Sequence, residues 1–393
     1  MAFLFLAGCT LGGAYAYLKW GISGEDQLKR AGVPVQPNER VNILVLGVDK
    51  EGERSDSMIL VSIDPEQKKI GALWIPRDTR AKIAGKGTLE KIAHAHAYNT
   101  KEMSGTQRSV QTVEDLLGVP VHHYVKVNFR GFVEIIDALG GVDINVKRRM
   151  EYHDPYQDLN INLAPGFQHL DGQKALWFVR WRESNDGKSG YENGDIGRIE
   201  TQQQFADALM KKIFTAGTIF KLPALASTIS QYVKTDLQPG DMVSLASLVS
   251  KMSREDIKTG LIPGDDRYID GISYRVPDVA GMQKVVDDLI RGIDRNANSA
   301  VRVEIMNGTD VPGLAAKMGD ALKSQGFNVI AVGNAARRNY STTQLLDRSG
   351  DDGKTKLVST AVGRLVSSAR LSKNPDAQAR ADVTVIIGKD FRR

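Results

Sequence analysis

The sequence has 393 residues, of which 41% are hydrophobic and 25% are charged. This composition is that of a globular protein, and it excludes a disordered chain, a collagen-like repeat and a multi-spanning membrane protein. The length predicts about two or three domains. The net charge of +5 is too small to indicate nucleic-acid binding by itself, and the single cysteine excludes an intramolecular disulfide.

The N-terminal end is apolar, with no charged residue in 1–18. About 20 apolar residues cross a bilayer as a helix, so residues 1–20 are predicted to be a single-pass membrane anchor. Two alternatives remain. The sequence LAGC that ends at Cys9 has the pattern of a lipoprotein signal, and a cleaved signal peptide is also considered, although no basic stretch precedes the apolar run. All three interpretations place the rest of the chain outside the cytoplasm.

A polar tether is predicted at 21–40, followed by a first domain at 41–214. The nearly continuous apolar run Val41–Asp49 is typical of a strand buried on both faces. The other expected elements are strands at 58–63, 70–75 and 142–146 and helices at 107–117, 129–139 and 197–214. Strands that alternate with amphipathic helices predict an α/β fold, a three-layer α-β-α sandwich with a mixed central sheet.

The rest of the sequence predicts two further parts. Residues 215–296 are expected to form a mainly helical extension and linker without obvious chemistry. A second α/β pattern follows and predicts a small C-terminal domain at 297–393. Its expected elements are strands at 301–306, 327–332 and 383–387 and helices at 312–325 and 354–369.

Aspartates and arginines cluster where the first three predicted strands begin or end. Asp49 closes the first strand, and Arg77 and Asp78 close the third. Arg54 and Asp56 open the second strand. Ligands of open α/β sheets bind at the carboxyl ends of strands, and oxygen ligands suit Mg²⁺ shared with substrate phosphates. Turn aspartates and surface ion pairs are the alternative interpretation.

A second polar cluster lies far along the sequence. Arg180 and Arg182 are expected to share one face of an extended segment. Arg198 and Gln202 are four residues apart and so share a helix face, and Asp195 could cap that helix. Arginine is the preferred side chain for bidentate contact with phosphate, so the two clusters together suit a pyrophosphate. A solvated basic face is the alternative.

Several motifs together resemble the LytR-CpsA-Psr family of cell-wall glycopolymer transferases, and they occur in the family's order. They are NILVLGVD, RSDSMILVSIDP, LWIPRDTR, GFVEIIDALGGVDINV, LDGQKALWFVRWR and GDIGRIETQQQ. Residues 301–391 resemble the separate LytR C-terminal domain found behind some members. The resemblance implies a membrane-anchored enzyme outside the cytoplasm. It would move an anionic glycopolymer from an undecaprenyl-pyrophosphate carrier to peptidoglycan, usually with formation of a phosphodiester.

The resemblance also assigns roles to individual residues. Asp49 and Asp56 match aspartates associated with Mg²⁺, and Arg54 and Arg77 match arginines that contact the pyrophosphate. Asp78 matches the aspartate beside Arg77, and its location, rather than the resemblance, makes it the candidate base for the acceptor hydroxyl. The far wall of the phosphate site is matched by Arg180, Arg182, Arg198 and Gln202, with Asp195 in the adjoining motif. The family also implies an apolar tunnel for the polyprenyl tail, whose lining the sequence does not identify.

One position departs from the family's GRIERQQ motif, because Thr201 replaces an arginine. This removes one positive charge near the site and could alter the polymer preference or the rate. A zinc site at His94 and His96 or at His122 and His123 would need further ligands. No G-x-S-x-G motif supports a serine hydrolase.

Two alternatives to a transferase come from other classes of protein. They are a non-catalytic envelope protein that binds lipid-linked sugars and a membrane-bound transcriptional attenuator. An attenuator that binds DNA would need a reading module in the cytoplasm, and no nucleic acid is expected as a partner.

Overall fold

The computed structural model describes residues 40–49, 54–156, 159–192, 195–213, 232–249, 251–363, 365–376 and 378–391. The predicted anchor at 1–20, with Cys9, lies outside these residues, and so does nearly all of the predicted tether. Among the helices of the described ranges, none is long and apolar enough to span a bilayer. The chain divides into two compact units, one ending at Arg291 and the other beginning at Gly292.

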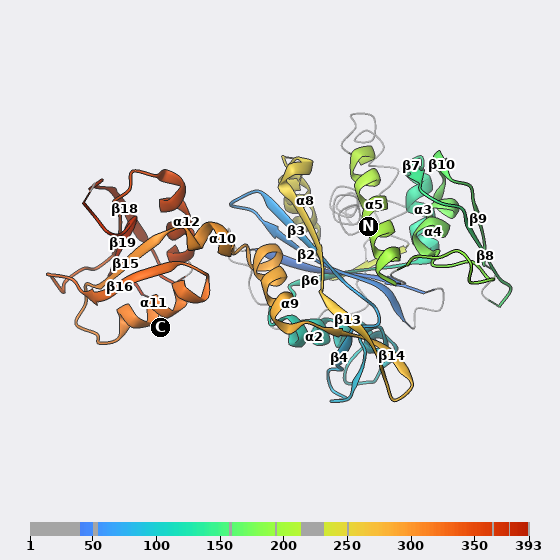
Figure 1. Cartoon of the computed structure of the whole chain (residues 1–393), viewed down its shortest axis with the longest axis horizontal. Coiled ribbons are helices and arrows are strands. Elements are labelled where there is room, and N and C mark those ends of the chain that lie inside the picture. The colour runs from blue at the N-terminus through green and yellow to red at the C-terminus, as the bar shows by residue number, and fades with distance from the viewer. Residues whose placement is uncertain are drawn as a thin grey trace. The chain divides into compact units, whose positions relative to one another are not determined.

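A six-stranded mixed sheet forms the centre of the first unit (Figure 1). Its strands are β1 (Val41–Val48), β2 (Ser55–Asp64), β3 (Lys69–Ile75), β6 (His123–Asn128), β11 (Val233–Thr235) and β12 (Ile257–Leu261). Their spatial order is β11-β6-β1-β2-β3-β12. β1 is antiparallel to β2 and parallel to β6, so the predicted mixed sheet is confirmed.

Strands β1, β2 and β3 are buried on both faces, which explains their continuous apolar sequences. Successive side chains of a strand point to opposite faces. Accordingly, Ile43 and Val45 of β1 belong to one core cluster, whereas Leu44 and Leu46 belong to another. Each cluster is completed by helices on its own side of the sheet.

Helices therefore cover both faces, in the α-β-α arrangement expected from the sequence. One face carries α3 (Phe129–Ala138), α4 (Gly172–Arg180), α5 (Asp195–Ile213) and α8 (Pro239–Val249). The other carries α2 (Gly105–Leu117), α9 (Val279–Val286) and the π-helix η3 (Asp287–Arg291). The predicted helices at 107–117, 129–139 and 197–214 agree with α2, α3 and α5 to within about two residues.

Local signals fix the ends of α2. The Ser104 hydroxyl accepts a hydrogen bond from Gln107 N, and the Gln107 side chain accepts one from Ser104 N. This capping box satisfies two backbone donors at the start of the helix. Gly118 ends α2 with φ of 64°, a left-handed conformation that glycine adopts without steric cost.

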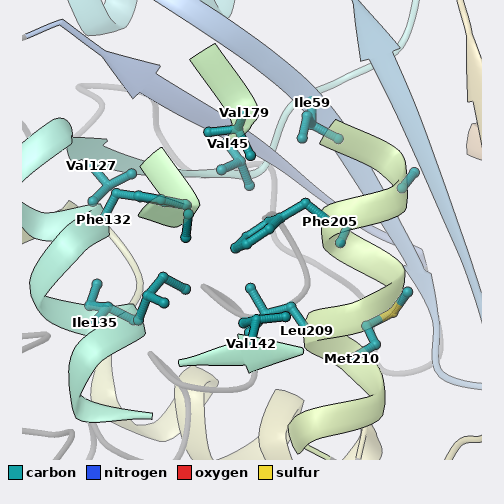
Figure 2. Close-up of a cluster of buried hydrophobic side chains, with 14 of the residues drawn as sticks. Val45, Ile59, Val127, Phe132, Ile135, Val142, Val179, Phe205, Leu209 and Met210 are labelled. Carbon is teal, nitrogen blue, oxygen red and sulfur yellow. The ribbon is translucent and has the colours of Figure 1, made fainter. Parts of the chain in front are cut away.

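The core around Phe132 and Phe205 joins α3 and α5 to the sheet (Figure 2). The two ring centroids are 5.5 Å apart, with an angle of 46° between the ring planes. Val45 and Ile59 from the sheet and Leu209 from α5 pack around them. Full burial of such side chains contributes about 1.5–3 kcal/mol each. This packing holds α5 in place beside the candidate site.

Smaller pairs of strands complete the first unit. They are β4 (Arg80–Lys82) with β5 (Leu89–Lys91), β7 (Val142–Val146) with β10 (Gly166–Leu170), β8 (Met150–Asp154) with β9 (Leu159–Leu163), and β13 (Gly264–Ile269) with β14 (Ile272–Pro277). The 3₁₀ helix η1 (Ile92–Ala97) follows β5, and η2 (Arg254–Asp256) precedes β12. The predicted strand at 142–146 is β7.

The region 215–296, which was expected to form a mainly helical extension, contains strands as well as helices. The described part of this region contains β11, β12, β13 and β14, and β12 pairs with β3 in the central sheet. These strands escape detection because their outer positions are polar, as in β13, where Asp265 to Tyr268 are all exposed. The compact first unit accordingly continues through this region to Arg291.

The second unit is a small α/β domain, as predicted. Its sheet has the order β16-β15-β19-β17-β18. The strands are β15 (Arg302–Asn307), β16 (Asn328–Asn334), β17 (Thr343–Asp347), β18 (Ala369–Lys373) and β19 (Val383–Ile387). Its helices are α10 (Arg295–Ser299), α11 (Leu314–Ser324) and α12 (Asp352–Gly363). The sequence did not predict β17 or β18, and every residue of β18 is exposed.

Candidate active site

A cavity of about 250 Å³ lies where β1, β3 and β6 reach their carboxyl ends, beside α3, α4 and α5. Its charged and amide-bearing lining includes Asp56, Arg77, Arg180, Arg182, Arg198 and Gln202. Its apolar lining includes Val127, Phe129, Phe132, Leu159, Ile161, Leu176 and Val179. The two polar clusters of the sequence thus meet at the predicted edge of the sheet, on a shared cavity.

Asp56 reaches the cavity from an irregularity in β2. The pairing of β1 with β2 shifts between Gly47 and Val48, which leaves Asp56 without a residue opposite it. Bulges of this kind redirect side chains and are common beside active sites. Arg77, two residues beyond the end of β3, donates from Nη1 to Asp56 Oδ1 at 2.9 Å. This bond links the second and third sequence motifs at the cavity wall.

Arg180 is the last residue of α4, which corrects the expected extended segment. Its guanidinium lies over the Phe129 ring, with Cζ 4.4 Å from the ring centroid. Burial lowers the pKa of Arg180, Asp56 acts to raise it, and Arg198 lowers it further. A partly desolvated guanidinium beside a second cation is stabilised by an anion, so this wall favours a bound phosphate.

Arg198 and Gln202 lie one turn apart on α5, and both line the cavity as their spacing predicts. Each is only 8% exposed. Gln202 Nε2 donates to Val179 O at 3.3 Å, and the Ser57 hydroxyl donates to Gln202 Oε1 at 3.5 Å. Gln202 therefore connects α5 to α4 and β2 at the cavity.

Asp49 and Arg54 lie on either side of residues 50–53, which are outside the described ranges. Arg54 N donates to Asp49 Oδ2 at 3.3 Å, and Asp49 N donates to Arg54 O at 3.1 Å. Neither is among the residues that line the cavity. Asp195 begins α5, and its side chain lies outside the described part of the structure.

Asp78 also does not line the cavity. Its Oδ1 lies 2.7 Å from Lys91 Nζ, and its Oδ2 lies 3.8 Å from Arg77 Nε. The sequence does not mark Lys91 as a site residue, because it lies on β5, away from Asp78 in the chain, and no local pattern identifies the pair.

The sequence also missed the apolar lining. Leu159 and Ile161 come from β9, in which apolar and polar residues alternate, and this alternation was the available strand signal. Val127 and Phe132 belong both to the cavity wall and to the core cluster (Figure 2). Apolar residues that face a cavity and those that face a core have the same sequence pattern, so spacing alone does not separate them.

Thr201 does not line the main cavity. Its hydroxyl oxygen lies 2.7 Å from the Tyr191 hydroxyl and 3.0 Å from Gly197 O, and it is 7% exposed as a residue. It lines a second, smaller cavity of about 100 Å³ together with Tyr191 and Arg148. Arg148 Cζ lies 5.3 Å from the Tyr191 ring centroid. The departure from the family motif therefore concerns this second cavity.

The oxygen ligands present suit Mg²⁺ shared with a substrate. Mg²⁺ is commonly bound through one or two carboxylates, with water and substrate phosphates completing its coordination. Asp49 and Asp56 both act electrostatically on Arg180, so they are the two carboxylates that would hold such an ion. In the described residues, no group of three or more histidines, cysteines, aspartates or glutamates is placed to hold a metal. His94 Nδ1 lies 3.3 Å from Glu90 Oε2, and His122 Nδ1 accepts from Asn42 N at 2.9 Å.

A cavity lined by arginines and apolar side chains at the end of an α/β sheet has the chemistry to suit an amphipathic anion. The chain belongs to the LytR-CpsA-Psr family, whose sequence profile matches residues 21–291. A second profile, described as LytR cell envelope-related transcriptional attenuator, matches residues 300–391.

Named relatives and solved structures agree with this assignment. Polyisoprenyl-teichoic acid–peptidoglycan teichoic acid transferase TagU of Bacillus cereus is 38% identical over 257 residues, which cover 63% of this chain and 77% of TagU. The transferase TagV of Bacillus subtilis is 32% identical over 311 residues, covering 75% of this chain and 77% of TagV.

The crystal structure of B. subtilis TagV is 31% identical, with a TM-score of 0.53, and the match covers 65% of this chain and 97% of that one. A structure of TagT bound to LIIa-WTA is 26% identical, with a TM-score of 0.52 and coverage of 66% and 97%. The comparisons confirm the predicted family, the LytR C-terminal domain and the predicted class of enzyme, a cell-wall glycopolymer transferase.

Proposed function

We propose that this chain transfers an anionic glycopolymer from an undecaprenyl-pyrophosphate carrier to peptidoglycan and forms a phosphodiester. The observation that carries the proposal is the cavity of about 250 Å³, whose walls combine several arginines with apolar side chains. The arginines suit a pyrophosphate, and the apolar wall suits the start of a prenyl chain. The relatives' names, which specify a polyisoprenyl-linked teichoic acid and peptidoglycan, support the same substrates.

The size of the cavity limits how much of the carrier it would enclose. Ligand pockets usually measure about 300–1,000 Å³, and this cavity measures about 250 Å³. It would therefore enclose the pyrophosphate and the first part of the tail rather than a whole polyprenyl chain. Each CH₂ group buried against its apolar wall would contribute about 0.8 kcal/mol.

In the proposed reaction, the acceptor hydroxyl oxygen bonds to the phosphorus attached to the glycopolymer. The bond from that phosphorus to the bridging oxygen breaks, and polyprenyl phosphate leaves with the electron pair. Arg77, Arg180 and Arg198 would hold the pyrophosphate and stabilise the charge that develops on it. A bound Mg²⁺, held by Asp49 and Asp56, would supply further charge neutralisation.

The acceptor hydroxyl must also lose a proton. Asp78 is the candidate base from the sequence, but its carboxylate contacts Lys91 and lies outside the cavity lining. Asp56, unlike Asp78, lines the cavity, and its Oδ1 accepts a hydrogen bond from Arg77 Nη1.

The test is transfer by the purified protein from a lipid-linked glycopolymer to peptidoglycan in the presence of Mg²⁺. Product is measured as polymer that resists detergent extraction and is released by muramidase. Arg77→Ala should lower the rate by about 10²-fold or more, because it removes a contact with developing charge. Arg148→Ala, which alters the second cavity, is the matched control and should retain activity. Binding of the lipid without product, or full activity of Arg77→Ala, would contradict the proposal.

We also propose that the chain is anchored in the cell membrane by residues 1–20, with its bulk outside the cytoplasm. The uncharged run at 1–18 and a lipid-linked substrate support this location. Removal of residues 1–20 should release the protein from the membrane fraction. Retention of the truncated protein in that fraction would refute the anchor.

A further inference from the structure

Four charged side chains form a line that leads from the cavity to β5. Arg77 Nη1 lies 2.9 Å from Asp56 Oδ1, and Arg77 Nε lies 3.8 Å from Asp78 Oδ2. Lys91 Nζ lies 2.7 Å from Asp78 Oδ1. Asp56 and Arg77 line the cavity, whereas Asp78 and Lys91 are not among its lining residues. The close partner of Asp78 is thus Lys91, and its contact with Arg77 is near the limit of an ion pair.

Backbone hydrogen bonds hold the loop that carries Arg77 and Asp78. Ala93 N donates to Arg77 O at 3.1 Å, and Ile92 N donates to Thr79 O at 2.8 Å. Arg275 N donates to Asp78 O at 2.9 Å. None of these bonds uses the Lys91 side chain, so a change of that side chain leaves the backbone of the loop supported.

Glu90, which precedes Lys91 on β5, is held in place by contacts of its carboxylate with several side chains. The Glu90 carboxylate accepts from Tyr98 at 2.6 Å and from Thr88 at 2.7 Å, and lies 3.3 Å from Lys86 Nζ. Burial acts to raise the pKa of Glu90, but the bonds from Tyr98 and its other partners outweigh burial and lower it to about 2. Glu90 therefore stays ionised at neutral pH, and its bonds hold the strand that presents Lys91 to Asp78.

We propose that Lys91 is a positioning residue for the transfer reaction. A carboxylate next to Arg77 competes with phosphate for its guanidinium. Asp56 already binds Nη1 of Arg77, and a second carboxylate drawn closer to Nε would turn the guanidinium away from the cavity. Lys91 binds the Asp78 carboxylate and so leaves Arg77 directed toward Asp56 and the cavity. The inference rests on the proposed function and gives Asp78 a role other than that of a base: together with Lys91 it sets the orientation of Arg77.

The role of Lys91 is tested by comparing three variants in the transfer assay. Lys91→Met removes the ammonium but keeps a side chain of similar length, and should lower kcat by about 10–100-fold because Asp78 then pairs with Arg77. Asp78→Asn removes the competing charge and should lower kcat by less than about tenfold. The double variant should be faster than Lys91→Met alone, because the neutral amide no longer competes for Arg77.

Two controls separate this inference from the proposed function and from loss of folding. Lys258→Met removes an exposed ion pair of similar length, 2.8 Å to Asp288, and should leave transfer unchanged. Thermal melting of each variant reports whether it is folded. If the wild-type protein does not transfer, the proposed function fails.

Three results would overturn the positioning role while the wild-type protein transfers normally. The first is full activity of Lys91→Met. The second is a double variant as slow as Lys91→Met, which would indicate direct contact of Lys91 with substrate. The third is a loss of about 10³-fold or more in Asp78→Asn, which would restore Asp78 as the base.

Discussion

Arg180 offers a sharp test of the proposed phosphate site, because its charge should strengthen binding of an anionic ligand but should not stabilise the folded protein. Burial and the nearby Arg198 lower the pKa of Arg180 and outweigh Asp56, Asp154 and Asp49, which act to raise it, so on balance the folded protein disfavours this charge before a ligand binds. Arg180→Met removes the charge and keeps an apolar side chain over Phe129. Replacing a buried charge with an apolar side chain of similar volume is often neutral or stabilising.

The expected magnitudes follow from the two contacts involved. Loss of the cation–π contact with Phe129 costs about 0.5–2 kcal/mol, and relief of the partly buried charge offsets it. The stability should therefore stay within about 1 kcal/mol of wild type, or roughly 2–4 °C in Tm for a unit of this size. The transfer rate should fall by about 10²–10³-fold, because one donor to the developing charge is lost.

Two measurements check this prediction, namely Tm by calorimetry and the transfer rate under identical conditions. Added pyrophosphate should raise the Tm of wild type more than that of Arg180→Met, since a ligand stabilises only the state that binds it. Arg148→Met is the matched control, because Arg148 also lies over an aromatic ring, that of Tyr191, but borders the second cavity. A large loss of Tm in Arg180→Met, or an unchanged transfer rate, would refute the reasoning.

Two further predictions concern stability. Asp382→Asn should destabilise the second unit by about 3 kcal/mol, because the buried carboxylate pairs with Arg302 at 3.1 Å and Lys354 at 2.9 Å. Burial acts to raise the pKa of Asp382, but these bonds lower it overall, so its contribution is present at neutral pH and lost as the pH falls below about 4. Hydrogen exchange across 292–393 measures both effects, and equal protection in the variant would contradict them. Gly71→Ala should destabilise the first unit by about 1–3 kcal/mol in urea unfolding, because an added Cβ would lie 1.9 Å from Leu289 O. Gly363→Ala, where nothing lies within 4 Å, is the control and should unfold as wild type does.

The sequence predicted the parts of the fold whose local pattern reflects one dominant environment. β1, β2 and β3 are buried on both faces, so their runs of apolar residues identify them. α2 carries a capping box at its start and a glycine at its end. The sequence does not reveal β12, because this strand is exposed or half-buried at four of its five positions and lies at an edge of the sheet. Its membership of the sheet depends on pairing with β3, which is a long-range contact without a local sequence signal.

The same distinction holds for the candidate site: some of its residues can be predicted from residue type and spacing, whereas their arrangement around one cavity depends on the order of the strands. Charged residues at the ends of apolar strands identified Asp56 and Arg77, and helical spacing identified Arg198 and Gln202, all of which line one cavity. Because β1 lies between β2 and β6 in the sheet, the bulge that exposes Asp56 faces the end of β6 across a single strand. That geometry places arginines next to apolar residues of α3, and no spacing along the chain encodes it. The combination of a charged rim with an apolar wall, on which the proposed substrate depends, is therefore a property of strand order rather than of any one motif.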